Sequence, residues 1–287
     1  MKNHFNTIGE ALNYIRHTLA NEYSQQESQS LSRLLLEHVL NKNIAIIRAN
    51  AGAKLSNSEI NQIQNSTFEL LNHKPLQQIT GVTAFYNIEI KTTADALIPR
   101  PETEELVAWV LSELPPGSNS RLLDVGTGTG CIAIALAKER PGAQVFAMDV
   151  SGKALALARL NAGKNGTHVT FIQKNVLIAE ENLEGEFDRI ISNPPYIPVS
   201  EKHALPKNVK NFEPELALFV PDSDPLLFYR GIEQNLQINL KKHGSFYFEI
   251  HENFETEISD YFSEKGYKVI LKKDINGKAR MVKAQKL

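Results

Sequence analysis

The sequence predicts an α/β protein, with a mostly parallel sheet closed by an antiparallel C-terminal hairpin and a small all-helical domain in front of it. From Arg121 onward, short apolar runs alternate with helical segments, which is typical of a parallel sheet. Near the C-terminus, Asn276-Gly277 between two strand-like runs indicates a hairpin. We divide the chain into a helical domain over 1–75, a linking hairpin over 76–95 and an α/β domain over 96–287.

Composition limits the class of protein. The hydrophobic share of 42% and the charged share of 22% are typical of a soluble globular chain. No apolar run approaches the roughly 18 residues of a membrane span, and the N-terminus lacks a signal-peptide core. Cys131 is the only cysteine, which excludes an internal disulfide and a cysteine-based zinc site and favours a reducing cytoplasm. The net charge of −2 argues against a phosphate backbone as the main partner.

The N-terminal domain is marked by repeated helix starts. Capping-box patterns occur at Thr7–Glu10, Ser24–Glu27 and Ser56–Glu59, and apolar residues at helical spacing follow each of them. No group here has catalytic spacing. We interpret the domain as a bundle that binds a partner, with a purely structural cap as the alternative. Residues 83–86 and 88–91 then read as two short strands that turn near Asn87.

The α/β domain begins with a helix at Pro101, a residue suited to the first helical position. We predict parallel strands at residues 122–125, 144–149, 169–173, 187–192 and 245–250. The predicted helices that connect and follow them span residues 131–140, 151–161, 225–240 and 254–265. The closing hairpin is predicted at 267–271 and 279–284.

A glycine-rich turn follows the first of these strands. Gly126, Gly128 and Gly130 let the backbone pass close to a ligand at a helix N-terminus. Asp149, at the end of the second strand, suits ribose hydroxyls, with helix capping as the alternative. Asn175 suits an adenine edge or is a plain loop residue. Residues 128–133 also fit the looser dinucleotide fingerprint, so glycine spacing alone does not exclude NAD.

The fourth strand ends in Asn193-Pro194-Pro195-Tyr196. The two prolines stop the strand and fix the backbone. The Asn193 side chain and the Pro194 carbonyl then form two acceptors for both hydrogens of a planar –NH2 group, and Tyr196 offers a face for stacking. Such a pair orients the nitrogen lone pair toward an electrophile and stabilises developing positive charge. The alternative is a mere strand-ending turn. Because hydride transfer has no use for this pair, the combination favours S-adenosylmethionine over NAD.

These residues resemble a known enzyme class. Asp124–Gly130 together with Asn193–Tyr196 is similar to the motifs of amino-group N-methyltransferases, which act on DNA adenine, ribosomal RNA guanine or protein glutamine. Ile98–Glu104 and Phe212–Leu218 resemble two blocks of the release factor glutamine methyltransferases. The helical N-terminal domain, the hairpin and the chain length match as well, so the resemblance covers nearly the whole chain.

The resemblance implies a Rossmann-like, S-adenosylmethionine-dependent methyltransferase fold. It implies methyl transfer to N5 of the glutamine in the Gly-Gly-Gln motif of peptide-chain release factors. Asp149 would hold the ribose, and Asn175 and Val176 would flank the adenine, where the family commonly has Asp and an aromatic residue. The residues that would line the methionine end of the cofactor are Gly126, Thr127, Gly128, Thr129 and Gly130. The residues that would form the glutamine pocket, with Asn193 also beside the cofactor, are Asn193, Pro194, Pro195 and Tyr196.

The expected mechanism needs no metal, no covalent intermediate and no general base, and we give Glu249 a structural role. We expect a cytoplasmic monomer that binds release factors through its helical domain and has no direct nucleic-acid or membrane partner. Two alternatives stay open. One is an N-methyltransferase that acts on an exocyclic amino group of adenine or guanine in DNA or ribosomal RNA. The other is a catalytically silent adaptor that only binds S-adenosylmethionine.

Overall fold

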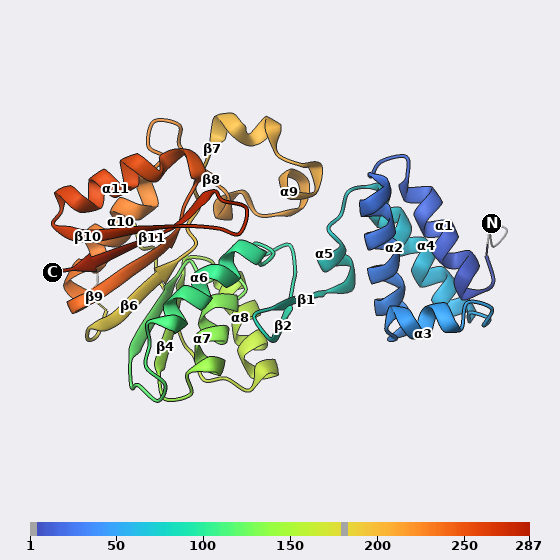
Figure 1. Ribbon diagram of the computed structural model, residues 1–287, viewed down its shortest axis with the longest axis horizontal. Coiled ribbons are helices and arrows are strands. Elements are labelled where there is room, and N and C mark those ends of the chain that lie inside the picture. Colours follow the sequence, from blue (N-terminus) through green and yellow to red (C-terminus); the bar gives the residue numbers. More distant parts are fainter. Residues whose placement is uncertain (1–4, 179–182) are drawn as a thin grey trace. The chain divides into compact units, whose positions relative to one another are not determined.

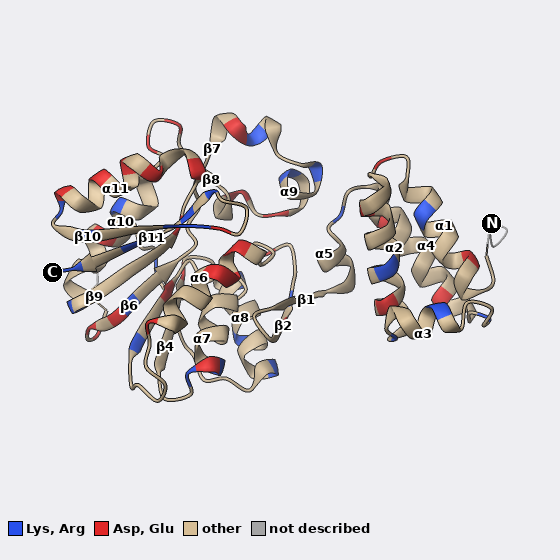
Figure 2. Cartoon of the chain, viewed as in Figure 1, with Lys and Arg blue, Asp and Glu red and all other residues tan. Residues whose placement is uncertain are grey.

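The computed structural model describes residues 5–178 and 183–287. The chain folds into two compact units (Figure 1). The buried apolar side chains of the two units form separate clusters. The smaller unit comprises Met1–Gly81 and Pro206–Phe212, and the larger one comprises Val82–Leu205 and Glu213–Leu287. Basic and acidic residues are interspersed along the elements of each unit (Figure 2).

The smaller unit is helical, as predicted. Its helices are α1 (Ile8–Leu19), α2 (Gln25–Leu40), α3 (Ile44–Ala49), α4 (Asn57–Leu71), α5 (Leu76–Thr80) and α9 (Lys207–Phe212). Complete capping boxes at Thr7–Glu10 and Ser56–Glu59 confirm two predicted helix starts. At the third, Ser24 Oγ accepts from the backbone N–H of Glu27 at 3.2 Å. The side chains that cap these helices therefore accept hydrogen bonds from some of the backbone N–H groups that the first turn leaves unpaired.

The apolar faces of the helices meet in one core. Because each buried large aliphatic or aromatic side chain contributes roughly 1.5–3 kcal/mol, this core stabilises the unit substantially. Its most buried members include Phe5, Ile8, Ile15, Leu19, Leu35, Leu36, Ile47, Ile60, Ile63 and Leu70.

Helix α9 comes from a distant part of the sequence but belongs to the smaller unit. The Gln78 side-chain amide donates to the Phe212 carbonyl at 2.9 Å. Lys207 Nζ lies 3.2 Å from His73 Nε2 and 4.0 Å from a carboxylate oxygen of Glu22. The sequence does not predict this helix, since six helical residues carry too little periodicity to identify one.

Within the described residues, the larger unit is built on a seven-stranded sheet. Its strand order is β10-β11-β9-β6-β3-β4-β5. Strands β9, β6, β3, β4 and β5 pair in parallel, and β11 and β10 close one edge in antiparallel pairing, as predicted. The strands are β3 (Arg121–Val125), β4 (Gln144–Asp149), β5 (Thr170–Gln173), β6 (Phe187–Ser192), β9 (Leu240–Glu249), β10 (Tyr267–Lys273) and β11 (Ala279–Lys286).

Helices cover both faces of the sheet (Figure 1). Strand alternation explains this arrangement. In β3, Leu122 packs in one core cluster and Leu123 in the other, and Ile191 and Ile190 of β6 divide in the same way. The helices that contribute to the first cluster are α6 (Pro101–Ser112), α7 (Cys131–Glu139) and α8 (Gly152–Asn165). The helices that contribute to the second are α10 (Leu227–Leu236) and α11 (Glu255–Glu264).

Short elements complete the larger unit. The predicted hairpin forms from β1 (Val82–Phe85) and β2 (Ile88–Lys91), and Tyr86 and Asn87 at its turn have φ of 40° and 63°. The other short elements are β7 (Ile197–Pro198), η1 (Val199–Ala204), η2 (Glu215–Ala217), β8 (Phe219–Val220), η3 (Gln237–Asn239) and η4 (Glu252–Phe254). No helix in the described ranges is long and apolar enough to cross a membrane.

The end of the predicted helix 225–240 and the start of the predicted strand 245–250 differ from those in the structure. Helix α10 ends at Leu236, and β9 already begins at Leu240, which pairs with Phe187. The ladder then shifts register, and His243 has a φ of 63° before pairing resumes at Ser245. The prediction missed this start because the irregular segment is polar and has no strand periodicity.

Candidate active site

A pocket lies at the carboxyl ends of β3, β4 and β6, beside the N-terminus of α7. Parallel sheets bind ligands at this edge because the loops that leave the strands converge there. All the residues that line the pocket belong to the larger unit. They include Leu97, Arg100, Thr103, Val125, Gly126, Thr127, Gly128, Thr129, Met148, Asp149, Asn175, Val176, Asn193, Pro194, Pro195 and Leu216.

The glycine turn between β3 and α7 forms one wall of the pocket. Gly126, Gly128 and Gly130 have φ of 71°, 55° and 84°, a region that side chains rarely adopt. A Cβ at Gly126 would meet no heavy atom within 4 Å, and at Gly128 the nearest side-chain atom would be Ala96 Cβ at 3.9 Å. These two positions therefore keep a space beside the backbone that a ligand can occupy.

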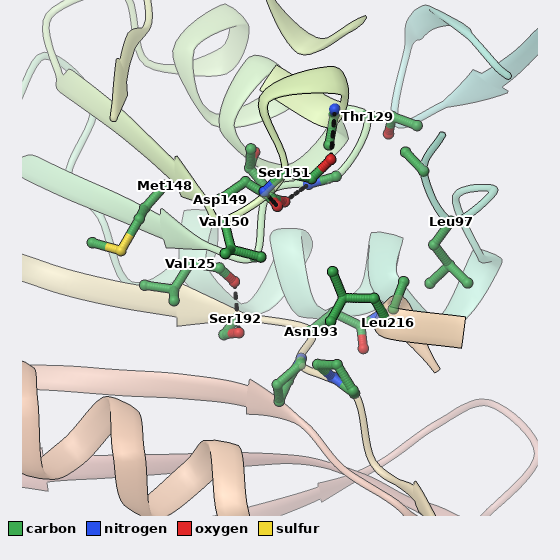
Figure 3. Close-up of a pocket in the computed structure, with 18 of the residues that line it drawn as sticks. Leu97, Val125, Thr129, Met148, Asp149, Val150, Ser151, Ser192, Asn193 and Leu216 are labelled. Carbon is green, nitrogen blue, oxygen red and sulfur yellow. Dashed lines mark hydrogen bonds between the residues drawn. The ribbon is translucent and has the colours of Figure 1, made fainter. Parts of the chain in front are cut away.

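Asp149, at the end of β4, has its carboxylate held by the backbone. Its Oδ2 accepts from Gly128 N at 2.9 Å and its Oδ1 from Ser151 N at 2.8 Å (Figure 3). A carboxylate has about four lone-pair sites, so it can accept two further hydrogen bonds from a diol. Asn175 Oδ1 accepts from Leu177 N at 3.0 Å, which leaves its Nδ2 as the polar end for a ligand. Val176 lines the pocket beside it.

Asn193 follows the last residue of β6. The strand is anchored to β3 beside it, because Ser192 Oγ donates to the Val125 carbonyl at 2.7 Å. Asn193 Nδ2 donates to Thr103 Oγ1 on α6 at 3.1 Å. In Figure 3, Asn193 lies near Leu216 and away from Asp149 and Ser151. The prolines that follow also line the pocket. Asn193 and the glycine turn thus border one cavity.

Tyr196 does not line that pocket. Its hydroxyl donates to Glu249 Oε1 at 3.0 Å, and its ring packs edge-on to His251 at a centroid distance of 6.0 Å. Burial raises the pKa of the Tyr196 phenol well above its usual range, and the neighbouring Glu249 carboxylate raises it further. In this structure Tyr196 therefore supports the turn after β6.

Comparisons with known proteins match this chain over most of its length. The family model "PrmC N-terminal domain" matches residues 10–81, and "Methyltransferase small domain" matches residues 105–209. A release factor glutamine methyltransferase of Flavobacterium psychrophilum is 44% identical over 92% of this chain and 94% of its own length. One of Bacteroides thetaiotaomicron is 39% identical over 95% of this chain and 98% of its own.

This chain belongs to the release factor glutamine methyltransferase family.

It is therefore a methyltransferase, and the glycine turn with its ambiguous spacing does not mark a dehydrogenase. The fold agrees with this. A solved methyltransferase of Pyrococcus furiosus, 18% identical, superposes with a TM-score of 0.53 over 78% of this chain and 98% of its own. At this identity the likeness concerns the fold alone.

Two buried carboxylates near the pocket had no predicted role in it. The Glu213 side chain, 1% exposed, accepts from Ile98 N at 3.1 Å and from Arg100 at 2.5 Å. Glu249, 1% exposed, accepts from Thr103 Oγ1 at 2.6 Å in addition to Tyr196. Burial raises the pKa of Glu249, and the two hydroxyl donors oppose that rise. Sequence spacing does not reveal these contacts. Glu213 lies more than a hundred residues from Ile98, and Glu249 lies more than a hundred residues from Thr103.

No cluster of His, Cys, Asp or Glu that could hold a metal ion occurs in the described part of the chain. Cys131 lines the pocket but is buried at the start of α7, and burial raises the pKa of its thiol to about 12. A thiol with so high a pKa is a poor nucleophile near neutral pH.

Proposed function

We propose that this methyltransferase transfers a methyl group from S-adenosylmethionine to the N5 amide nitrogen of a glutamine in peptide-chain release factors, within their Gly-Gly-Gln motif. The observation that carries the proposal is the Asn193 amide, whose nitrogen is bound to Thr103 and whose oxygen is thereby left as the acceptor end. The names of the relatives support release factors as the substrate.

The residues present fit the cofactor. The open space beside Gly126 and Gly128 suits a close backbone approach, the Asp149 carboxylate suits a ribose diol, and Asn175 and Val176 suit the adenine edge and face. When bound, S-adenosylmethionine supplies an activated methyl group on a sulfonium. The residues that we assign to cofactor binding, all of which line the pocket except Gly130, are Gly126, Thr127, Gly128, Thr129, Gly130, Asp149, Asn175, Val176 and Asn193.

The residues after β6 handle the acceptor glutamine. Asn193 Oδ1 and the Pro194 carbonyl would each accept one N–H of the substrate amide, and the rigid prolines hold both acceptors in place. Fixing both hydrogens directs the nitrogen lone pair and stabilises the charge that develops on nitrogen. We assign Tyr196 to the support of this turn and Pro195 to the pocket wall. The methylated nitrogen, once cationic, loses its proton to an acceptor or to water.

The helical unit is proposed to contact the release factor away from the chemistry. This gives a reason for a second core in a chain whose pocket lies wholly in the larger unit. Because the proposed substrate belongs to the translation machinery, we propose a cytoplasmic location, and we expect a monomer with no membrane partner and no direct contact with nucleic acid.

The test is incubation of the protein with labelled S-adenosylmethionine and, in parallel, purified release factor, ribosomal RNA or DNA. We expect label in release factor alone, and mass mapping should place one methyl group on the glutamine of Gly-Gly-Gln. Label in nucleic acid without label in release factor would favour the exocyclic-amine alternative. Cofactor binding without any transfer would favour the silent adaptor.

A further inference from the structure

Three residues from distant segments form one hydrogen-bonded chain behind the acceptor site. Asn193 Nδ2 donates to Thr103 Oγ1 at 3.1 Å, and Thr103 Oγ1 donates to Glu249 Oε2 at 2.6 Å. Thr103 is 3% exposed and Glu249 is 1% exposed, so water does not compete for the bond between them, and the bond from Asn193 is partly buried. The chain links the end of β6, helix α6 and the end of β9.

The chain has a fixed polarity. Both Glu249 oxygens act as acceptors, Oε1 for the Tyr196 hydroxyl and Oε2 for Thr103, so the single hydroxyl proton of Thr103 is committed to Glu249. The Thr103 oxygen is then left as an acceptor, and the side of the Asn193 amide that faces it must be the NH2 group. Its carbonyl oxygen consequently forms the other end. No hydrogen bond within the described residues engages that oxygen.

The same carboxylate holds the far side of the turn. Glu249 Oε1 accepts from the Tyr196 hydroxyl at 3.0 Å, while Oε2 serves Thr103. One buried group therefore contacts the first residue of the Asn193–Tyr196 turn through Thr103 and its last residue directly. The two prolines between them add stiffness, so the position of Asn193 depends on both contacts.

We propose that Thr103 and Glu249 are positioning residues that determine which end of the Asn193 amide faces the substrate. The inference rests on the proposed function, in which Asn193 Oδ1 accepts an N–H of the substrate amide. A flipped Asn193 amide would present its NH2 group to the NH2 group of the glutamine. Two donors cannot hydrogen-bond to each other, so the flipped state would not orient the acceptor.

A matched buried carboxylate separates positioning from mere stability. Glu233 on α10 is also 1% exposed and also accepts from two hydroxyls, those of Tyr261 at 2.9 Å and Tyr267 at 3.0 Å. It does not line the pocket. Glu233→Gln therefore imposes the same chemical change on the same unit without touching the Asn193 amide.

The first experiment compares Thr103→Val with Thr103→Ser in steady-state methylation of release factor. We expect Thr103→Val to lower kcat by about tenfold, the typical effect of one buried hydrogen bond, without raising the KM for release factor. Thr103→Ser keeps the hydroxyl and should restore kcat to within about twofold of the wild type. Affinity for S-adenosylhomocysteine should stay unchanged in both. Equal kcat in the two variants would overturn the proposal.

The second experiment compares Glu249→Gln with Glu233→Gln. In Glu249→Gln, the new side-chain amide would bring an N–H toward either Thr103 or Tyr196, each of which donates to the carboxylate in the wild type. We expect a lower kcat for Glu249→Gln and a wild-type kcat for Glu233→Gln, with similar losses of thermal stability in the two. Equal losses of kcat would show that Glu249 acts through stability alone.

A third measurement does not depend on turnover. In protein labelled with 15N-asparagine, the Asn193 side-chain NH2 signal, assigned with Asn193→Ala, should show slowed exchange with solvent in the wild type and in Thr103→Ser. Thr103→Val should lose that protection. An unprotected signal in the wild type would refute the positioning role. Because this result is independent of the substrate, it separates failure of the inference from failure of the proposed function.

Discussion

The neighbours of Asn193 determine which end of its side-chain amide is available to a ligand. Its amide has a donor end and an acceptor end of nearly equal shape, so position alone does not specify what it can bind. The bond from Nδ2 to Thr103 Oγ1 gives the two ends different tasks. The sequence indicated the residue through the strand that precedes it and the prolines that follow it.

Replacing Asn193 tests its role directly. Asn193→Ala should lower kcat by at least about a hundredfold, since a pre-oriented polar group at the reacting centre typically contributes that much. Affinity for S-adenosylhomocysteine should change little, because the glycine turn and Asp149 are intact. Turnover of release factor and calorimetric titration measure the two effects.

Asn165→Ala is the matched control, since the Asn165 side-chain amide on α8 donates to the Glu89 carbonyl and Asn165 does not line the pocket. It should methylate at the wild-type rate. Wild-type turnover in Asn193→Ala would instead assign the acceptor role to another group.

At the scale of elements, the turn between β3 and α7 was predictable because its signal is local. Alternating glycines after an apolar strand specify positive φ and a close backbone approach within a few residues. The three glycines have different tasks, however. Gly126 and Gly128 border open space, whereas Gly130 caps α7 and lies against α8.

Gly130→Ala should therefore be disruptive. Its φ is 84°, and a Cβ there would lie 3.0 Å from both Ala158 Cβ and Ile134 Cδ1. Backbone strain and overpacking together should lower the free energy of unfolding by roughly 2–4 kcal/mol, which thermal and urea unfolding can measure.

The comparison is Gly117→Ala, where φ is 75° but no heavy atom lies within 4 Å of the added Cβ. Its loss should reflect the strained backbone alone and be clearly smaller. Equal losses in the two variants would mean that packing against α8 contributes nothing.

Other elements were beyond prediction for a common reason. The early start of β9 at Leu240 and the short helix α9 lie in polar stretches, where hydrophobic periodicity gives no signal. Their conformations are specified by partners remote in sequence, Phe187 for β9 and Gln78 for α9.

At the scale of the whole molecule, a buried carboxyl group next to the glycine turn makes the stability of the fold depend on pH. Asp124 lies 1% exposed beneath the glycine turn, where its Oδ2 accepts from Thr127 Oγ1 at 2.6 Å and from Ala133 N at 3.2 Å. Burial raises the pKa of this carboxyl from 3.8 to about 7, and the nearby Asp149 adds to the rise. Between those two values the folded chain binds a proton that the unfolded chain does not, so this group makes stability fall as pH rises.

Asp124→Asn removes that titration while keeping an oxygen acceptor for the two donors. The variant should therefore gain in unfolding temperature relative to the wild type as pH increases from 5 to 8, with most of the gain reached by about pH 7. Thermal unfolding at several pH values measures it. A difference that stays constant across this range would show that Asp124 does not titrate there.

The amino-acid sequence by itself determined the two-part organisation, the parallel sheet with its antiparallel edge, the glycine turn and the Asn193–Tyr196 turn. These features follow from local patterns of apolar residues, glycine and proline, which act over a few positions along the chain. Only the tertiary structure decided that Thr103 and Glu249 stand behind Asn193, and that residues 206–212 join the helical unit. Contacts of that kind join segments far apart in sequence, and their geometry exists only after both cores have packed.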